Sequence, residues 1–379
     1  MKRVLLVVPT YNEADNIASL IEESRKATKP LHGYSLGILI VDDNSPDGTG
    51  RVVNKLQKND KKLHLLSGKK AGLGKAYVRG LKHGLALGGY DIIMTMDADF
   101  SHDPHSIPSL VNAIEDGADY AIGSRYVRGG RTSGWPMHRK LNSRSANFIA
   151  RVLLDLQYDI RDLTGGFKAL RVSALKTINL DAIRASGYAI GINLLHEFSK
   201  QGYKISEVPI TFSNRNQGRS KLRLRDVLEF LYISYRLNPD SRIRRIIRFS
   251  MVGASGAVVN LGTLFILVNY LELPVLLSGA IAIEVSIISN FFLNHTYTFR
   301  AAYTSPKTLR RDTLKALLTK LLKYNLIYIG GAAIAFTVFA TAHQALGIHY
   351  LLADAISILV AMSWNYWMSI RIVWKVVDE

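Results

Sequence analysis

The stretch that decides the fold is Tyr90-Asp91-Ile92-Ile93-Met94-Thr95-Met96-Asp97-Ala98-Asp99. Its apolar run predicts a buried strand, and ligands of open α/β sheets bind just beyond the carboxyl ends of such strands. Asp97 and Asp99 stand at that end, and paired carboxylates suit Mg²⁺ or Mn²⁺, which share their remaining positions with water and substrate phosphates. An isolated Asp-x-Asp is weak evidence and by itself favours a solvated turn after a strand, so the neighbouring motifs decide between the two interpretations.

Two earlier apolar runs end in polar residues in the same way. Residues 4–8 are followed by Pro9-Thr10-Tyr11-Asn12-Glu13, and residues 36–41 by Asp42-Asp43-Asn44-Ser45-Pro46-Asp47-Gly48. A basic, glycine-rich turn, Gly68-Lys69-Lys70-Ala71-Gly72-Leu73-Gly74, then leads into a predicted helix. Strands ending at one edge of a presumed parallel sheet predict a nucleotide site. The chain lacks the glycine fingerprints of dinucleotide and P-loop sites.

These motifs resemble the GT-A fold of glycosyltransferase family 2, and within it the dolichol-phosphate mannose synthases and other polyprenyl-phosphate glycosyltransferases. The matching blocks follow the family order from residue 4 to about 222. They are Val8-Pro9-Thr10-Tyr11-Asn12-Glu13, Val41-Asp42-Asp43-Asn44-Ser45-Pro46-Asp47, Gly72-Leu73-Gly74, Asp97-Ala98-Asp99, Gly123-Ser124-Arg125-Tyr126, Trp135-Pro136 with Arg139, Gly165-Gly166-Phe167, and Arg215 with Gly218, Ser220 and Lys221. The resemblance implies an α/β, Rossmann-like catalytic domain over residues 1–222.

The resemblance also implies a donor site. Within it, Asp97 would support the ribose and the metal geometry, and Asp99 would be the main metal ligand. Ser101 stands where some relatives have Gln as a further ligand, an arrangement compatible with an extra water. The nucleotide sugar would be held by Pro9, Tyr11, Glu13, Val41, Asp42, Asp43, Lys69, Gly74, Asp97, Ala98 and Asp99.

The acceptor site implied by the resemblance is cationic. Arginine forks suit phosphate oxygens bidentately, although isolated surface arginines are usually only solvated. The phosphate of a lipid acceptor would be surrounded by Arg125, Arg139, Ser143, Arg215 and Lys221. Of these, Arg125 and Arg215 would join Asp97 and Asp99 in catalysis.

The acceptor's own chemistry predicts a mechanism without a catalytic base. A lipid monophosphate has its second pKa near ~6 and is largely dianionic at neutral pH. Asn193 occupies the position where relatives that act on hydroxyl groups carry a carboxylate. We therefore expect an in-line displacement at the anomeric carbon with inversion, in which the metal neutralises charge on the departing nucleoside diphosphate.

The second half of the chain is predicted to span a membrane. Four apolar stretches, 249–271, 274–295, 324–345 and 350–370, approach or exceed the ~20 residues that a transmembrane helix needs. Lysines and arginines lie before the first stretch, between the second and third, and after the fourth, whereas the turns near Glu272 and His349 contain none. The positive-inside rule then places both termini and the catalytic domain in the cytoplasm.

The four stretches are one hairpin repeated. Shifting the numbering by 75 aligns Arg248 with Lys323, Gly256 with Gly331 and Asn290 with Asn365 without a gap. Two tandem hairpins imply a parallel repeat about an axis normal to the membrane, and residues 248–379 resemble the GtrA-like membrane domain, associated with polyprenyl-linked sugar transfer. Asn290, Asn365 and Glu284 lie within the spans, either as lipid or sugar contacts or, for the asparagines, as polar links between helices.

Amphipathic helices are predicted at the membrane surface between the two halves. Residues 223–247 carry apolar residues at helical spacing beside arginines, and Pro239 breaks the pattern. Residues 308–323 repeat this composition. Ordinary packing against the catalytic domain is the alternative for one face of each helix.

The composition agrees with a membrane enzyme. The net charge of +18 could suggest a nucleic-acid partner, but the basic residues gather beside the spans. Anionic lipid headgroups and phosphorylated substrates are therefore the expected partners, and nucleic acid is not. The chain has no cysteine, which excludes disulfides and thiolate metal sites.

We therefore predict a multi-pass enzyme of the cell membrane, with its catalytic domain and both termini cytoplasmic. It would use Mg²⁺ or Mn²⁺ to move mannose from GDP-mannose to dolichyl or polyprenyl phosphate. UDP-glucose is the alternative donor, because the base-contacting residues do not discriminate in sequence. A flippase or carrier of the lipid-linked sugar is the alternative of another class. A processive polysaccharide synthase is disfavoured, because the chain lacks a Gln/Arg-x-x-Arg-Trp block.

Overall fold

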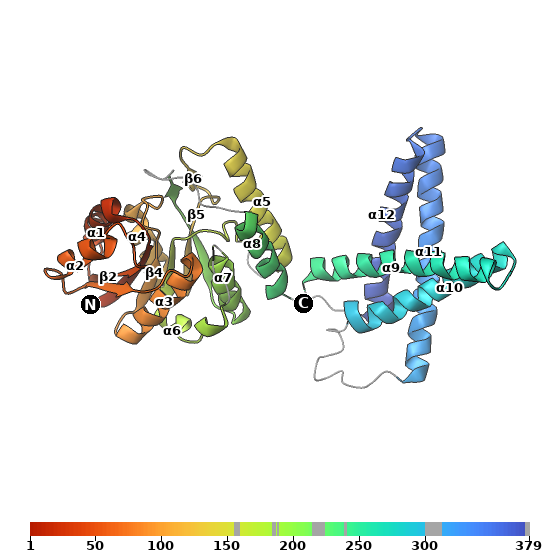
Figure 1. The fold of residues 1–379 in the computed structure, drawn as a ribbon, viewed down its shortest axis with the longest axis horizontal. Helices are drawn as coiled ribbons and strands as arrows, with labels where there is room; N and C mark the ends of the chain where they lie inside the picture. The colour runs from red at the N-terminus through yellow and green to blue at the C-terminus, as the bar shows by residue number, and fades with distance from the viewer. Residues whose placement is uncertain are drawn as a thin grey trace. The chain divides into compact units, whose positions relative to one another are not determined.

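A computed structural model describes residues 1–154, 160–183, 187, 189–213, 224–238, 241–299 and 313–375. The chain forms two compact units, Met1–Pro239 and Asp240–Glu379 (Figure 1). The first unit is an α/β layer structure and the second is helical.

The first unit is built on a seven-stranded sheet in the order β3-β2-β1-β4-β7-β5-β8. Its strands are β1 (Lys2–Thr10), β2 (Tyr34–Asp42), β3 (Leu63–Ser67), β4 (Ile92–Thr95), β5 (Tyr120–Ser124), β7 (Lys168–Arg171) and β8 (Ile205–Pro209). The helices are α1 (Ala14–Thr28), α2 (Thr49–Gln57), α3 (Leu73–Leu87), α4 (Ile107–Glu115), α5 (Met137–Leu154), α6 (Val172–Leu175), α7 (Ile190–Lys200) and α8 (Leu224–Leu237). Two short strands, β6 (Arg131–Thr132) and β9 (Thr211–Phe212), form a separate parallel pair.

The sheet is mixed, which corrects the expectation of a parallel sheet. Strands β1, β2, β3 and β4 pair in parallel, but β7 runs antiparallel to both β4 and β5. After β5 the chain forms α5 and returns to begin β7 opposite the end of β4, with Lys168 paired to Thr95. A strand that starts at the edge where its neighbours end must run the opposite way.

Both faces of the sheet are buried. In β1, Val4, Leu6 and Val8 pack in one hydrophobic cluster, and Leu5 and Val7 pack in the other. Such a strand reads as a continuous apolar run, because helices cover both of its faces. The sheet therefore fixes the ends of β1, β2 and β4, from which the site is built.

Among its described residues, the second unit has four helices that are long and apolar enough to cross a membrane. They are α9 (Arg242–Asn269), α10 (Val275–Leu293), α11 (Leu314–Ala340) and α12 (Tyr350–Met368), and the last three continue through π-helical turns. Residues 242–247, which we had expected in a separate interfacial helix, are the first turns of α9. Large side chains along the helices, such as Val258, Leu276 and Phe336, are exposed, as expected of surfaces that face lipid.

The predicted repeat is visible in the packing. A Cβ atom at Gly256 would lie 2.2 Å from Nδ2 of Asn290, and one at Gly331 would lie 2.3 Å from Oδ1 of Asn365. In each hairpin, glycine lets the backbone of one helix approach the asparagine of the other. Each asparagine therefore packs at the helix–helix contact of its own hairpin, and its role as a polar link or as a lipid or sugar contact stays a prediction.

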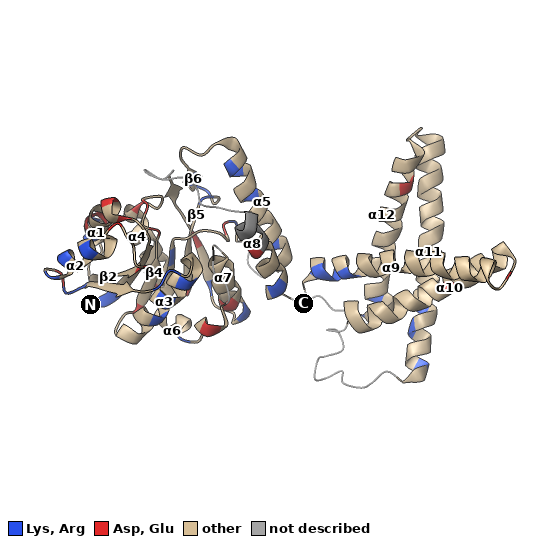
Figure 2. Cartoon of the chain, in the orientation of Figure 1, with Lys and Arg blue, Asp and Glu red and all other residues tan. Residues whose placement is uncertain are grey.

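The two hairpins meet at their basic ends. Phe249, Phe291, Phe299, Tyr324 and Trp374 form one buried cluster, in which the rings of Phe299 and Trp374 stack with centroids 4.3 Å apart. Figure 2 shows the lysines and arginines of the helices near these ends, and acidic residues toward the opposite ends. This charge distribution is the one on which the orientation prediction depends.

Candidate active site

Three loops build the candidate site, and each follows a strand of the sheet. The loops after β1, β2 and β4 contain the left-handed residues Asn12 (φ 63°), Asn44 (φ 51°) and Phe100 (φ 57°). Asparagine tolerates this conformation, but phenylalanine does so at a cost in free energy. Strain of this kind persists where the surrounding structure imposes it, commonly at functional sites.

The first two loops are joined by hydrogen bonds. The backbone N–H of Asn12 donates to Oγ of Ser45 at 3.0 Å, and that of Ala14 donates to Oδ2 of Asp47 at 2.9 Å. Burial alone would raise the pKa of Asp47, but hydrogen bonds from Thr49 and Ala14 outweigh it and lower the pKa. Asp47 is therefore ionised, and its carboxylate holds the loop after β1 against the loop after β2.

A cavity of about 200 Å³ lies where these loops meet. Seven of the predicted donor-site residues line it, together with five that we had not predicted. The predicted ones are Pro9, Tyr11, Glu13, Asp43, Asp97, Ala98 and Asp99, and the others are Thr10, Lys70, Gly72, Leu73 and Ala76. Lys70 places its Nζ 3.2 Å from the centre of the Tyr11 ring.

Four predicted donor-site residues are not among the lining residues. Val41 is fully buried in β2, and Gly74 is buried in the first turn of α3. The Asp42 carboxylate accepts hydrogen bonds from Oγ1 of Thr10 at 3.0 Å and Oγ of Ser45 at 2.6 Å, and so links the end of β1 to the loop after β2. The cavity is lined by Lys70 instead of the predicted Lys69. The roles assigned to these four residues remain predictions.

The Asp-x-Asp carboxylates are held by neighbouring groups. Tyr77 donates from its hydroxyl to Oδ1 of Asp97 at 2.6 Å, and the backbone N–H of Ser101 donates to Oδ1 of Asp99 at 3.0 Å. Asp99 is 8% exposed. These bonds orient both carboxylates, and both residues line the cavity.

The site fits a divalent metal ion. Within the described residues, no three His, Asp or Glu side chains form a ready-made metal cage. Mg²⁺ does not require one, since it is commonly bound by one or two carboxylates with substrate phosphates completing its shell. The Oγ of Ser101 is buried and has no hydrogen-bond partner among the described residues. Asp97, Asp99 and Ser101 therefore offer a donor set of the right chemistry.

His102 is a site residue that the sequence analysis missed. Its ring is fully buried, its Nδ1 lies 3.8 Å from Oδ2 of Asp97, and it packs edge-on against Phe212 with centroids 4.9 Å apart. Burial lowers the pKa of His102, against the opposing effect of Asp97 and Asp99. The ring is therefore neutral at physiological pH, and its place five residues after Asp97 was the available signal.

Lys168 was also missed, although it directly follows the matched block Gly165-Gly166-Phe167. The side chain is buried in β7, between β4 and β5. Burial lowers the pKa of Lys168 to about 8, even though Asp97 and Asp162 favour its charged form. Lys168 therefore supplies a buried cationic group that interacts electrostatically with Asp97 of the Asp-x-Asp motif.

Arg125, a predicted acceptor-site residue, is engaged in a buried ion pair. Its Nε and Nη2 donate to the Asp162 carboxylate at 2.7 and 2.6 Å, and Nη2 also donates to Oγ1 of Thr164 at 2.7 Å. Burial alone would lower the pKa of Arg125, but Asp162 reverses the effect and raises it. The guanidinium therefore stays charged.

The other predicted acceptor residues gather around two aromatic rings. The Arg139 guanidinium lies 4.0 Å from the centre of the Trp135 ring, and Tyr126 donates from its hydroxyl to Oγ of Ser143 at 2.7 Å. Arg125 lies 5.3 Å from the Tyr126 ring and 5.4 Å from that of Trp135. Arg125, Arg139 and Ser143 therefore form one cationic cluster. Arg215 and Lys221 lie outside the described residues.

Asn193 lies in the first turn of α7 and is buried. Its Nδ2 donates to the carbonyl oxygen of Ala189 at 3.0 Å. The side chain is therefore occupied within its own helix, as a neutral amide.

Comparison with known proteins identifies the family. Residues 5–178 match the family model of Glycosyl transferase family 2, and residues 248–374 match that of the GtrA/DPMS transmembrane domain. The Dolichol-phosphate mannosyltransferase of Pyrococcus furiosus is 36% identical over 375 residues, which cover 98% of this chain and 99% of that protein. This chain belongs to glycosyltransferase family 2. The resemblance found in the sequence is confirmed, and the chain is a membrane glycosyltransferase.

Two further relatives of this glycosyltransferase cover less of its length. The Polyprenol monophosphomannose synthase of Mycolicibacterium smegmatis is 40% identical and covers 61% of this chain and 85% of its own. The Undecaprenyl-phosphate mannosyltransferase of Micrococcus luteus is 39% identical and covers 58% of this chain and 87% of its own. The match to the Pyrococcus furiosus protein covers 98% of this chain and therefore includes the helical unit.

Proposed function

We propose that this glycosyltransferase transfers mannose from GDP-mannose to dolichyl or polyprenyl phosphate, with inversion at the anomeric carbon. The observation that carries the proposal is the match, over nearly the whole chain, to a protein named as a dolichol-phosphate mannosyltransferase. The names of the two other relatives also specify mannose and a polyprenyl lipid. The donor cavity and the cationic cluster in the first unit support the same reaction.

The donor nucleotide lies in the cavity at the ends of β1, β2 and β4. The carboxylates of Glu13 and Asp43 accept hydrogen bonds from the base and ribose, and Arg79 holds Asp43 in place through a 2.7 Å ion pair. Lys70 brings a positive charge to the same cavity, which suits a diphosphate. Asp97, Asp99 and Ser101 would hold Mg²⁺ or Mn²⁺, and a metal bound there would neutralise charge on the departing nucleoside diphosphate.

The acceptor phosphate binds among Arg125, Arg139 and Ser143. Arg139 and Nη1 of Arg125 bind its oxygens and orient one of them toward the anomeric carbon. A phosphate monoester is largely dianionic at neutral pH and attacks without a general base. The neutral, internally bonded Asn193 is consistent with this, since a hydroxyl acceptor would require a carboxylate there.

The enzyme lies in the cell membrane with its catalytic unit in the cytoplasm. This placement is supported by the basic residues near the ends where α9 begins and α12 ends. It is also supported by the absence of Lys and Arg from the turns near Glu272 and His349 (Figure 2).

The donor is tested with purified full-length protein in detergent. Radiolabelled GDP-mannose and UDP-glucose are supplied in parallel with polyprenyl phosphate, with Mn²⁺, Mg²⁺ or EDTA, and label in the lipid phase is counted. We expect metal-dependent transfer from GDP-mannose and little from UDP-glucose. Faster transfer from UDP-glucose would refute the assignment of the donor, and synthesis that persists in EDTA would refute the role of the metal.

A further inference from the structure

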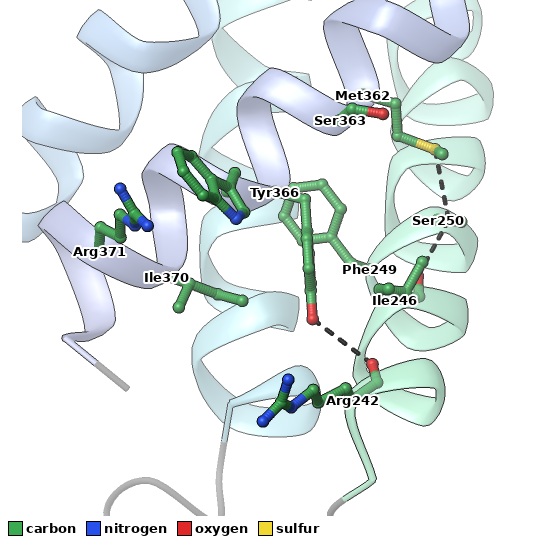
Figure 3. Close-up of a pocket in the computed structure, with 10 residues that line it drawn as sticks. Arg242, Ile246, Phe249, Ser250, Met362, Ser363, Tyr366, Ile370 and Arg371 are labelled. Carbon is green, nitrogen blue, oxygen red and sulfur yellow. Dashed lines mark hydrogen bonds between the residues drawn. The ribbon is translucent and has the colours of Figure 1, made fainter. Parts of the chain in front are cut away.

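A second cavity, of about 530 Å³, lies in the helical unit (Figure 3). It opens between the first turns of α9, which contribute Arg242 and Phe249, and the end of α12 with its π-helical continuation. These contribute Tyr366 and Trp367, and Arg371, respectively. Nothing in the proposed reaction uses this cavity. Its position at the basic ends of two membrane helices suggests a ligand that is partly in the membrane and partly in water.

The internal repeat provides a matched comparison for this cavity. Shifting by 75 residues relates the pairing of α9 with α12 to that of α11 with α10. The two arginines of the cavity then become Leu317 and Thr296, and Tyr366 becomes Phe291. Phe291 and Tyr324 are fully buried, with ring centroids 5.6 Å apart. Phe249, the counterpart of Tyr324, is buried as well, but Tyr366 is only partly buried where its counterpart Phe291 is fully enclosed, and the cavity beside it carries two cations.

The cavity is amphipathic. Phe249 and Tyr366, whose ring centroids are 5.3 Å apart, form its apolar wall with Met362. Arg242 and Arg371 supply the charge, and the Arg371 guanidinium lies 3.4 Å from the centre of the Trp367 ring. Stacking on an indole fixes a guanidinium while leaving its edge free to meet phosphate oxygens.

We propose that this cavity binds a single-chain lipid monophosphate, with the phosphate between Arg242 and Arg371 and the first isoprenoid unit against Phe249 and Tyr366. A phosphate monoester carries ~1.5 to 2 negative charges at neutral pH, which two arginines match, whereas a glycerophospholipid diester carries one. The choice of lipid rests on the proposed function, because the acceptor belongs to this class.

Binding of farnesyl phosphate by isothermal titration calorimetry tests the inference. The protein is the full chain in detergent carrying Arg139→Ala, which weakens binding at the catalytic unit. Since each basic residue near a charged lipid strengthens binding roughly fivefold, adding Arg242→Gln and Arg371→Gln should weaken binding by about thirtyfold. The control pair Lys315→Gln and Lys323→Gln removes two exposed charges from α11, away from the cavity, and should change the dissociation constant less than twofold.

Competition identifies the lipid class. Phosphatidylglycerol and inorganic phosphate should compete poorly with farnesyl phosphate, because the former has one charge and two chains and the latter has no chain. The inference is overturned if the arginine pair leaves binding unchanged, if the α11 pair weakens it equally, or if phosphatidylglycerol competes as well as farnesyl phosphate. Ser363→Trp, which fills the cavity without removing a charge, should weaken binding too, and it decides the matter if the arginine variant does not fold.

The two proposals fail separately. Arginine-dependent binding in a protein that transfers no sugar to polyprenyl phosphate would overturn the proposed function and leave the cavity as a lipid site. Efficient sugar transfer, together with farnesyl phosphate binding that is unchanged by replacing Arg242 and Arg371, would overturn only the present inference.

Discussion

Replacing Asp162 by Asn tests the buried ion pair beneath the acceptor cluster. Asp162 is fully buried, and its carboxylate accepts three hydrogen bonds from Arg125, two from the guanidinium and one from the backbone N–H at 2.9 Å. Asparagine keeps the size of the side chain and removes its charge. The substitution therefore leaves a buried guanidinium without a counter-charge.

The magnitude follows from the geometry. Charges ~4 Å apart at an effective dielectric constant of ~20 attract each other by about 4 kcal/mol, and removing one partner of a buried pair costs ~3–5 kcal/mol. For a unit of this size the melting temperature should fall by roughly 8–16 °C. Burial alone would raise the pKa of Asp162, but Arg125 lowers it. The pair therefore stabilises the fold at neutral pH, and this contribution is lost as the pH falls below the unfolded value of ~3.9.

The assay is thermal unfolding of the full chain in detergent, followed by intrinsic fluorescence. The control is Asp60→Asn, which removes the partner of Arg25 from a 2.7 Å ion pair whose side chains are 32% and 27% exposed. Partly exposed pairs contribute ~0.2–1 kcal/mol, so this variant should melt near the wild type. If Asp162→Asn melted within a degree or two of Asp60→Asn, the uncompensated-charge argument would be wrong.

Three further predictions concern the catalytic unit. Asp99→Asn should lower metal-dependent transfer by ~10²-fold or more, because it removes the proposed main metal ligand. Initial rates over a Mn²⁺ series check this, and a near-wild-type rate would contradict it. Arg139→Ala should raise KM for polyprenyl phosphate by about tenfold without changing KM for GDP-mannose, and a lost donor affinity would show that the acceptor site is misplaced. Lys168 has a folded pKa of about 8, below the unfolded ~10.4, so the free energy of unfolding should rise by about 3 kcal/mol between pH 8 and 10.5. Denaturant titrations of Lys168→Met should lack this rise, and its persistence would show that Lys168 is not the group responsible.

Much of the fold could be predicted from local patterns. The apolar runs of β1, β2 and β4 and the polar residues that follow them determine where the strands end. Their parallel pairing then brings Glu13, Asp43 and Asp99 to one cavity. The repeat of 75 residues predicted the equivalent packing of Asn290 and Asn365, because glycine stands opposite each asparagine.

The features that were missed depend on contacts between distant segments. Lys168 reads as an ordinary cation in sequence, and only the insertion of β7 between β4 and β5 buries it. His102 is enclosed by Phe167 and Phe212, which are remote along the chain. Lys70 lines the cavity and the adjacent Lys69 does not. The sequence does not distinguish the two lysines, because the backbone direction in the glycine-rich turn determines which side chain points to the cavity.

The measurement that tests the central claim most directly compares polyprenyl phosphate with the matching polyprenol as acceptor. Purified full-length protein receives radiolabelled GDP-mannose and Mn²⁺, and label extracted into the organic phase is counted. In the proposed reaction the acceptor phosphate is the nucleophile and Asn193 supplies no base, so we expect labelled lipid from the phosphate and none from the alcohol. Label on the alcohol, or none on either lipid, would contradict it.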